Sequence, residues 1–134
     1  MNLVENKEIL TREDYPVSNV LVDGVLSRTV RLPKGHLVVG EIHKYESINF
    51  LISGELRIHY NGKVNHLKAP SMIVSKANTR KVVFALEDVV WTSIHKTDKT
   101  NIKDIEEDLI IKEDIEQVKE YLTTINKEEL LCLG

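Results

Sequence analysis

Cysteine, proline, glycine and aromatic residues are all scarce in this sequence. Its 134 residues include one cysteine, three prolines and six glycines, and 5 % of them are aromatic. The lone cysteine, Cys132, cannot form a disulfide within the chain, and such usage is typical of a reducing compartment. No apolar run approaches the ~20 residues that cross a membrane, and Met1 to Leu10 has no signal-peptide core. These absences predict a cytoplasmic protein without a membrane partner.

A large excess of charge of one sign is missing as well. The net charge is −3, made of +3 in residues 1–100 (14 Lys and Arg against 11 Asp and Glu) and −6 in residues 101–134 (4 against 10). The basic excess is too small, and too interrupted by acidic residues, to follow a phosphate backbone, so we expect no nucleic-acid partner. Glycine-rich phosphate loops, paired zinc-ligand cysteines and nucleophile motifs are not found either.

What remains is the composition of one ordinary globular domain. Apolar residues make up 42 % of the chain and charged residues 29 %, and the length is sufficient to bury a core. The hydrophobic period changes near Thr97, with short β-rich runs before it and a helical pattern after it. We therefore predict a β-sandwich or β-barrel in residues 1–97 and a helical extension of the same domain in residues 98–134.

Alternating runs that are bounded by turn residues predict the strands of the first part. Residues 55–60 (ELRIHY) alternate strictly, and Asn61-Gly62 follows at once, which is the strongest short-range hairpin signal because both residues tolerate a positive φ. The predicted strands are 25–32, 36–44, 48–52, 55–60, 63–67, 72–75, 82–85 and 89–95. Seven or eight short strands joined by tight turns indicate a sandwich or a closed barrel.

The second part carries amphipathic helices. Apolar residues follow helical spacing over 102–109 and again over 111–122, and polar residues among 98–101 are available as the first N-cap. Asn126 followed by Glu129 has the form of a capping box that opens a last short helix. The apolar stripe of these helices needs a surface to cover, either on their own barrel or on a neighbouring subunit.

Two segments resemble the conserved motifs of the cupin superfamily. Residues 35–43 (GHLVVGEIH) and 49–56 (NFLISGEL) resemble the first motif, and residues 75–88 resemble the second. The resemblance covers about residues 25–97 and implies a jelly-roll barrel. The stretch 70–98 is similar to small cupin-like proteins of bacteriophages, which implies the host cytoplasm as the location if the gene is carried by a phage.

The resemblance also implies where a metal would bind. Enzymatic cupins hold a divalent metal with three His and one Glu, which leave open positions for substrate. In this chain Glu41 stands at the first His position, His43 at the second, Ser47 (next to Glu46) at the Glu position, and Lys81 at the last His position. A protonated Lys has no lone pair to donate. No cofactor is therefore expected; a divalent metal on Glu41, His43 and Glu46 is the alternative.

The same substitutions favour an anion over a metal. A Lys within a small barrel attracts anions, and ligand sites in barrels are apolar cavities with a few placed polar groups. The candidate ligand-binding residues are His43, Asn49 and Lys81 as polar groups, Arg80 and Arg57 as neighbouring cations, and Tyr45 and Trp91 as stacking surfaces. Trp91 can equally be a core residue. The other histidines are expected to be structural or exposed: His36, His59, His66 and His95.

Three functions follow as hypotheses. The first is a non-metal cupin that binds a small anionic molecule without catalysis, in one version a phage protein that sequesters a nucleotide-like host signal. The second is a metal-dependent enzyme such as an isomerase or dioxygenase. The third is an assembly protein with a filled barrel. Under all three we expect a homo-oligomer, because exposed sheet edges and an amphipathic tail invite self-association.

Overall fold

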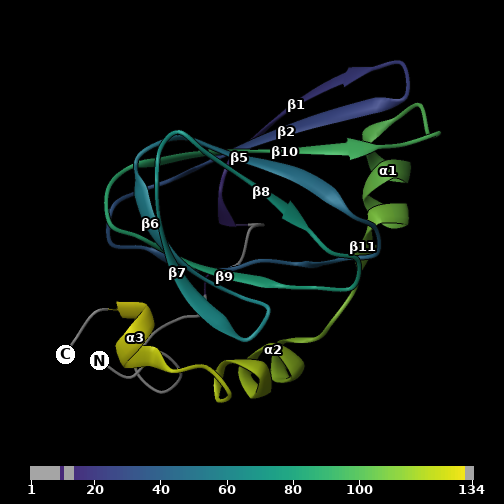
Figure 1. The fold of residues 1–134 in the computed structure, drawn as a ribbon. Coiled ribbons are helices and arrows are strands. Elements are labelled where there is room, and N and C mark those ends of the chain that lie inside the picture. The colour runs from purple at the N-terminus through teal and green to yellow at the C-terminus, as the bar shows by residue number, and fades with distance from the viewer. Residues whose placement is uncertain (1–9, 11–13, 132–134) are drawn as a thin grey trace.

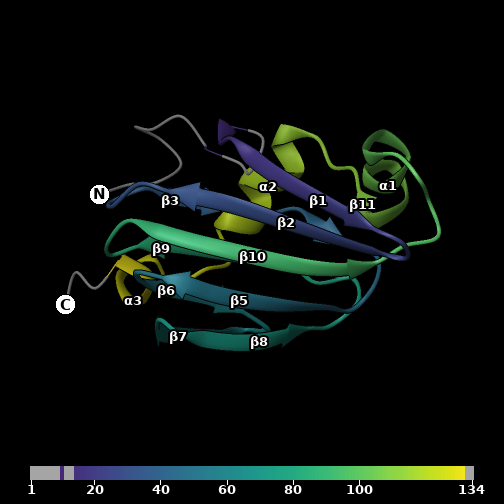
Figure 2. The ribbon, with the colours of Figure 1, turned by 90° about the horizontal axis from the view of Figure 1, so that it is seen from above.

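Two antiparallel sheets face each other and enclose the core (Figure 1). The computed structural model describes residue 10 and residues 14–131, and Cys132 lies outside them. The first sheet has the strand order β1-β2-β10-β5-β8, which Figure 2 shows from above. Its strands are β1 (Val17–Val22), β2 (Val25–Leu32), β10 (Val89–Lys96), β5 (Ser47–Ser53) and β8 (Ser71–Ser75).

The second sheet has the order β3-β9-β6-β7, and a two-stranded ribbon joins β11 to β4. The bounds are β3 (Leu37–Val39), β4 (Ile42–His43), β6 (Glu55–Tyr60), β7 (Lys63–Lys68), β9 (Lys81–Ala85) and β11 (Ile110–Ile111). Every predicted strand except 36–44 is present as one strand, and Asn61 and Gly62 have the positive φ values, 54° and 77°, that the predicted hairpin turn requires. The predicted jelly-roll barrel with C-terminal helices is confirmed.

The structure differs from the predicted strands in two places. One strand was predicted over residues 36–44, but the chain bends at Gly40, whose N–H donates to the Lys81 carbonyl at 2.8 Å. Strand β1 was not predicted; nearly all of its residues are exposed, and its sequence does not alternate between apolar and polar residues. The bend at Gly40 is what turns Glu41 and His43 toward the barrel interior.

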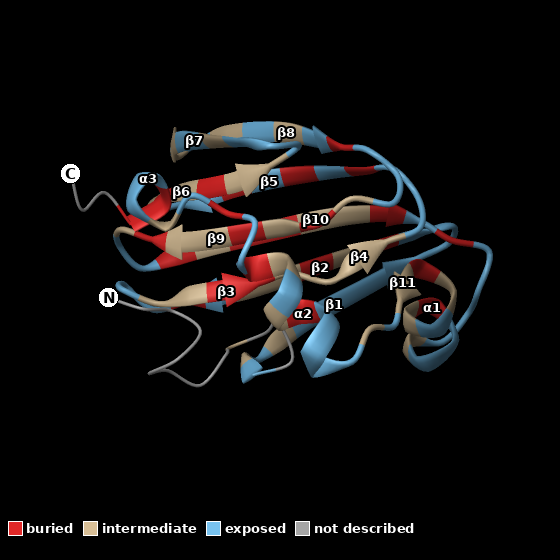
Figure 3. Ribbon diagram, turned by 90° about the horizontal axis from the view of Figure 1, so that it is seen from below, coloured by how far each residue is buried: buried red, intermediate tan, exposed pale blue. Residues whose placement is uncertain are grey.

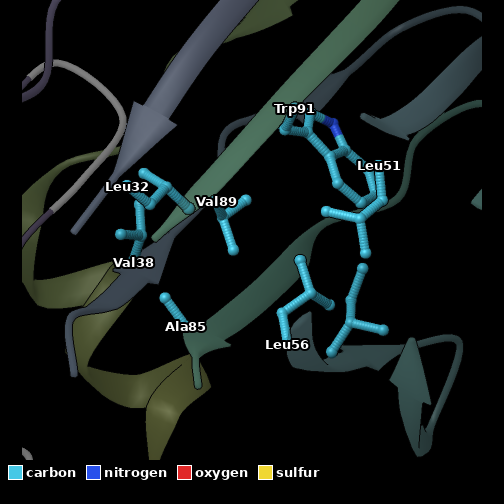
Figure 4. Close-up of a cluster of buried hydrophobic side chains, with 8 residues drawn as sticks. Leu32, Val38, Leu51, Leu56, Ala85, Val89 and Trp91 are labelled. Atoms are coloured by element: carbon cyan, nitrogen blue, oxygen red, sulfur yellow. The ribbon is translucent and has the colours of Figure 1, made fainter. Parts of the chain in front are cut away.

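The core between the sheets comes from inward positions of both. Alternate residues of β5 and β10 are buried (Figure 3), and they meet residues of β6 and β9 from the other layer. Figure 4 shows the resulting cluster, in which side chains of the two sheets point toward one another. Its buried members are Leu32, Val38, Leu51, Leu56, Ile58, Ala85, Val89 and Trp91. This cluster fills one part of the barrel and leaves the remainder to polar side chains.

The C-terminal helices pack on their own barrel. They are α1 (Ile102–Leu109), α2 (Ile115–Leu122) and α3 (Lys127–Leu131). The second cluster joins the second sheet to α2 and α3; its members are Val39, Val82, Val118, Leu122, Ile125 and Leu130. Helix α1 packs its Ile105 and Leu109 on Leu26 of β2. None of the helices in the described ranges is long and apolar enough to cross a membrane.

The helix caps follow the sequence signals in part. Asn101 caps α1 by accepting from the Asp104 N–H, and Asn126 accepts from the Glu129 N–H at the start of α3. Asp114 and Gln117 form a capping box on α2 that the sequence reading did not identify. Ile111 was assigned to a helical run but lies in β11, where it pairs with Ile42.

Candidate functional site

A cavity of about 100 Å³ lies inside the barrel, beside the apolar cluster. Two of its walls, Leu32 and Trp91, are shared with that cluster, and Val30 and Val83 extend the apolar lining. Five titratable side chains line it too: Arg28, Glu41, His43, Lys81 and His95. The combination of apolar walls with a few convergent polar groups is that of a small-molecule site.

The strand period places these groups on one side of their strands. Trp91, Ser93 and His95 are alternate residues of β10, so all three face the cavity. Arg28 comes from β2, and Lys81 is the first residue of β9, next to the bend at Gly40. The site is thus assembled from both sheets, and no short segment of the sequence contains it.

His95 is the most enclosed polar group of the cavity. It is 3 % exposed, and its ring stacks on that of His43 with centroids 5.2 Å apart and an interplanar angle of 27°. Burial, together with neighbouring His43, Arg28 and Lys81, lowers the pKa of His95 to about 3, so the ring is neutral at physiological pH. Its Nε2 atom is buried and has no hydrogen-bond partner among residue 10 and residues 14–131.

Lys81 is largely buried beside it. Burial lowers the pKa of Lys81 to about 8, because few polar groups replace the water around the ammonium. The ammonium lies 5.6 Å from the centroid of the Tyr60 ring, an aromatic contact that compensates part of the lost hydration. Among the described residues, no carboxylate forms an ion pair with Lys81.

Arg28 and Glu41 complete the charges of the cavity. Arg28 is 7 % exposed, and its Nη2 lies 3.7 Å from Oε1 of Glu106 on α1, which ties that helix to the barrel. His95 is neutral, and the lining also contains two cations, Arg28 and Lys81, and one carboxylate, Glu41. Arg28 has Glu106 as a counter-charge, whereas Lys81 pairs with none of the described carboxylates. The ammonium of Lys81 next to apolar walls therefore favours an anionic ligand, since a buried charge without a counter-charge is costly.

Asn49 lines the cavity but its amide is fully occupied. Its Nδ2 donates to the Ser75 hydroxyl at 2.6 Å and to the Ser47 hydroxyl at 3.3 Å. Its Oδ1 accepts from the Ser93 hydroxyl at 2.9 Å and from the Trp91 indole N–H at 3.3 Å. An amide has two donor hydrogens and two lone pairs, so Asn49 holds the Trp91 wall in place and has little capacity left for a ligand.

Of the seven candidate ligand-binding residues, the structure brings four together at the cavity: His43, Asn49, Lys81 and Trp91. Arg80 lines a different hollow, of about 510 Å³, between the barrel and α1 and α2; there it forms an ion pair with Glu113 and lies over the Tyr121 ring. Arg57 faces away from the interior on β6, between the inward Leu56 and Ile58. Tyr45 is exposed and donates to Asp108 at 3.1 Å.

Two titratable residues of the cavity, His95 and Arg28, were not predicted from the sequence. His95 was expected to be structural or exposed, but it is buried against His43 inside the cavity. The alternation Trp91-Ser93-His95 could have placed it there, had the direction of Trp91 been known. Nothing in the sequence indicated that Arg28 lines the cavity, because a lone Arg in a strand most often reaches solvent. For His36, His59 and His66 the structure gives partners outside the cavity: Tyr15, Tyr121 and Glu55.

The residues present do not fit the metal centre of enzymatic cupins. Ser47, at the Glu position, is hydrogen-bonded to Asn49, and Lys81, at the last His position, brings an ammonium into the cavity. Glu46 is exposed outside the barrel and lies 3.7 Å from Lys76. Within the described part of the chain, no three His, Cys, Asp or Glu side chains are placed to share a metal ion. The alternative set of Glu41, His43 and Glu46 therefore does not converge.

Comparisons with known proteins place the fold. No protein-family model matches the chain, and no curated protein matches it. Among solved structures, a double-stranded β-helix protein from Klebsiella pneumoniae is 21 % identical, with a TM-score of 0.56 over 73 % of this chain and 85 % of that one.

Two further structures show how varied the proteins with this fold are. The cupin domain of an XRE family transcriptional regulator from Enterobacter cloacae is 15 % identical, with a TM-score of 0.54 over 63 % of this chain and 98 % of that one. A salicylate 1,2-dioxygenase from Pseudaminobacter salicylatoxidans is 11 % identical, with a TM-score of 0.60 over 78 % of this chain and 32 % of that one. At such identities the likeness establishes a cupin-type fold, and the chemistry has to be argued from the site.

Proposed function

We propose that this cupin-fold protein binds a small organic carboxylate inside its barrel and does not convert it. The observation that supports this most directly is the buried, unpartnered Nε2 of His95 in a cavity where Lys81 and Arg28 supply positive charge. A buried polar atom without a partner costs free energy, roughly 1–3 kcal/mol, which a ligand oxygen would recover. A neutral His95 with its proton on Nε2 donates to that oxygen.

The carboxylate and the apolar part of the proposed ligand would contact different walls of the cavity. Lys81, Arg28 and His95 lie near one another, since the first two both lower the pKa of His95. Trp91, Leu32, Val30 and Val83 form the apolar wall on which a short hydrocarbon group would pack. Holding the carboxylate does not require catalysis, and the two cavity hydroxyls are engaged by neighbours: Ser93 with Asn49 and Thr29 with Thr92.

The size of the cavity limits the ligand. A cavity of ~150 Å³ holds one benzene, and drug-sized ligands need about 300 Å³ or more. At about 100 Å³ the space suits a molecule of a few non-hydrogen atoms, or the end of a longer one. The narrower hypothesis of a sequestered nucleotide-like host signal therefore requires that only the phosphate end enters the barrel.

Isothermal titration calorimetry at pH 7 tests the proposal, with acetate, propionate, benzoate, salicylate, phosphate and adenosine monophosphate as titrants. We expect the small carboxylates to bind and Lys81→Met to weaken them at least tenfold, because an anion held in a dry cavity loses a charge-assisted partner. Arg57→Met removes a cation outside the cavity and is the matched control, with unchanged affinity. Binding that Lys81→Met leaves intact, or no binding by any titrant, would contradict the proposal.

The metal content of the purified protein distinguishes the metal-enzyme hypothesis from the binding proposal. Stoichiometric metal in protein purified without chelator, lost in His43→Ala, would replace the binding proposal. The hypothesis of a filled barrel conflicts with the cavity itself, because a solid core would leave no space between Trp91, Lys81 and His95.

A further inference from the structure

The outer face of the five-stranded sheet is apolar and nothing in the described chain covers it. Its exposed apolar side chains come from four strands: Val20, Val22, Val25, Ile48, Phe50, Ile52, Met72 and Val74. We call this set the open face. Exposed fractions run from 36 % for Phe50 to 61 % for Val22. Single exposed apolar residues need no explanation, but a contiguous group of this kind marks an interaction surface.

The strand register makes the open face continuous. Ile48 is opposite Val74 of β8 and opposite Ile94 of β10, and Phe50 is opposite Met72. Residues opposite one another on neighbouring strands lie side by side on one face. On β2 and β1, Val25 pairs with Val22, and Ser27 lies between Ile94 of β10 and Val20, so apolar residues continue at the far edge of the sheet with one serine among them.

The two sheets of the barrel differ in what covers them. The outer face of the second sheet is buried under α2 and α3, which lie below it in Figure 1. The open face has the same apolar character but no helix of its own; α1 covers only Leu26 at one end of the barrel. The described part of the chain thus covers the outer face of the second sheet and leaves the open face uncovered.

The charge pattern favours a second copy of the chain as the surface that covers the open face. Arg31 and Lys96 point outward at opposite ends of the β2–β10 pair, and between them every outward position of β10, β5 and β8 is uncharged. A charged partner would bury its charges against hydrocarbon at a large cost. An identical open face carries no such charges and is present at the same concentration. Two copies related by a twofold axis bring the same residues together from both sides.

The area is sufficient for a stable dimer. A standard interface buries about 800 Å² on each partner, and a homodimer interface is about 65 % apolar, so each partner must bring roughly 500 Å² of apolar surface. The eight side chains of the open face expose roughly 600–700 Å² together, more than the largest patch of a typical monomer. We propose that the open face is the contact surface of a twofold symmetric homodimer, with Ile48, Phe50 and Met72 near its centre.

Sedimentation velocity of the full chain over a hundredfold range of concentration tests this proposal. The unmodified protein is expected to sediment as a dimer, and Phe50→Glu to raise the dimer dissociation constant at least a hundredfold, because it places a carboxylate against hydrocarbon. Ile115→Glu is the matched control: Ile115 is also apolar and 48 % exposed, but lies on α2, away from the open face. It is expected to leave the dimer intact.

Met72→Glu is a second variant of the open face, for the case that Phe50→Glu does not fold. Met72 is 57 % exposed on β8, the last strand of the sheet, so its side chain contributes little to the core. Circular dichroism and the melting temperature confirm that each variant is folded. A monomeric unmodified protein would overturn the proposal. So would a dimer that persists in both Phe50→Glu and Met72→Glu but dissociates in Ile115→Glu, since the contact would then belong to the helices.

Discussion

His95 is the side chain on which the proposed ligand site depends most. It is buried against His43, its Nε2 has no partner, and its pKa is lowered to about 3. A neutral imidazole between two cations, Arg28 and Lys81, can offer its N–H to an anion without adding a third positive charge. In the proposed complex, the three side chains would hold a carboxylate more specifically than a cluster of cations would.

The same burial makes the protein sensitive to acid. In the unfolded chain His95 takes up a proton near its ordinary pKa of 6.5, whereas in the folded protein it does so only near 3. The unfolded state therefore binds more protons between these values, and stability is complete above pH 6.5 and falls as the pH falls toward 3. Between pH 7 and pH 5 this one group is expected to remove about 2 kcal/mol from the free energy of unfolding.

Urea unfolding at the two pH values measures this effect. His95→Gln keeps a donor but does not titrate, so the variant is expected to lose about 2 kcal/mol less than the unmodified protein between pH 7 and pH 5. His66→Gln is the control, because His66 is exposed on β7 and paired with Glu55. An equal loss in the unmodified protein and in His95→Gln would show that His95 is protonated in the folded state.

At the scale of elements, the connection between β5 and β6 carries the chain from one sheet to the other. Gly54 sits between them with φ at +93°, and a Cβ there would lie 2.2 Å from the carbonyl oxygen of Asp88. Gly35 also has a positive φ, +84°, but no atom lies within 4 Å of its Cβ position. Replacement of Gly35 would therefore cost only the strained backbone conformation, whereas replacement of Gly54 would add a steric clash.

Alanine at each position measures the two costs. Gly35→Ala is expected to lower the free energy of unfolding by ~1 kcal/mol, for the positive φ alone. Gly54→Ala adds a clash with backbone atoms that are fixed in the sheet, so we expect a loss of about 3 kcal/mol or more. Chemical denaturation of both variants gives the comparison. Equal losses would mean that the β5–β6 and β9–β10 turns can move apart.

Elements with strong local signals were predictable, and those set by long-range contacts were not. The hairpin at Asn61-Gly62 and the strand before it follow from alternation and turn chemistry alone. In contrast, β11 forms only because Ile110 and Ile111 find β4 as a partner, which no local pattern reveals. The cavity shows the same division: the motif spacing indicated His43 and Lys81, whereas Arg28 and His95 depended on register across the sheet.

At the scale of the whole molecule, the barrel has a covered face, an open face and an interior that is only partly filled. The apolar cluster shown in Figure 4 and the two helix-contact clusters account for most of the fully buried hydrocarbon. The cavity also contains the buried ammonium of Lys81 and the buried Nε2 atom of His95, which has no hydrogen-bond partner among the described residues. Groups of this kind lower stability unless a ligand compensates them, which is the reason to regard the cavity as a binding site.

Anomalous diffraction from crystals soaked in bromide tests that central claim most directly, because the bromide position shows where the protein holds an anion. We expect a peak inside the barrel, within hydrogen-bonding reach of Lys81 Nζ and His95 Nε2, and no such peak in Lys81→Met crystals. Bromide that occupies surface sites while the barrel stays empty would contradict the account, and so would a cavity peak that survives Lys81→Met.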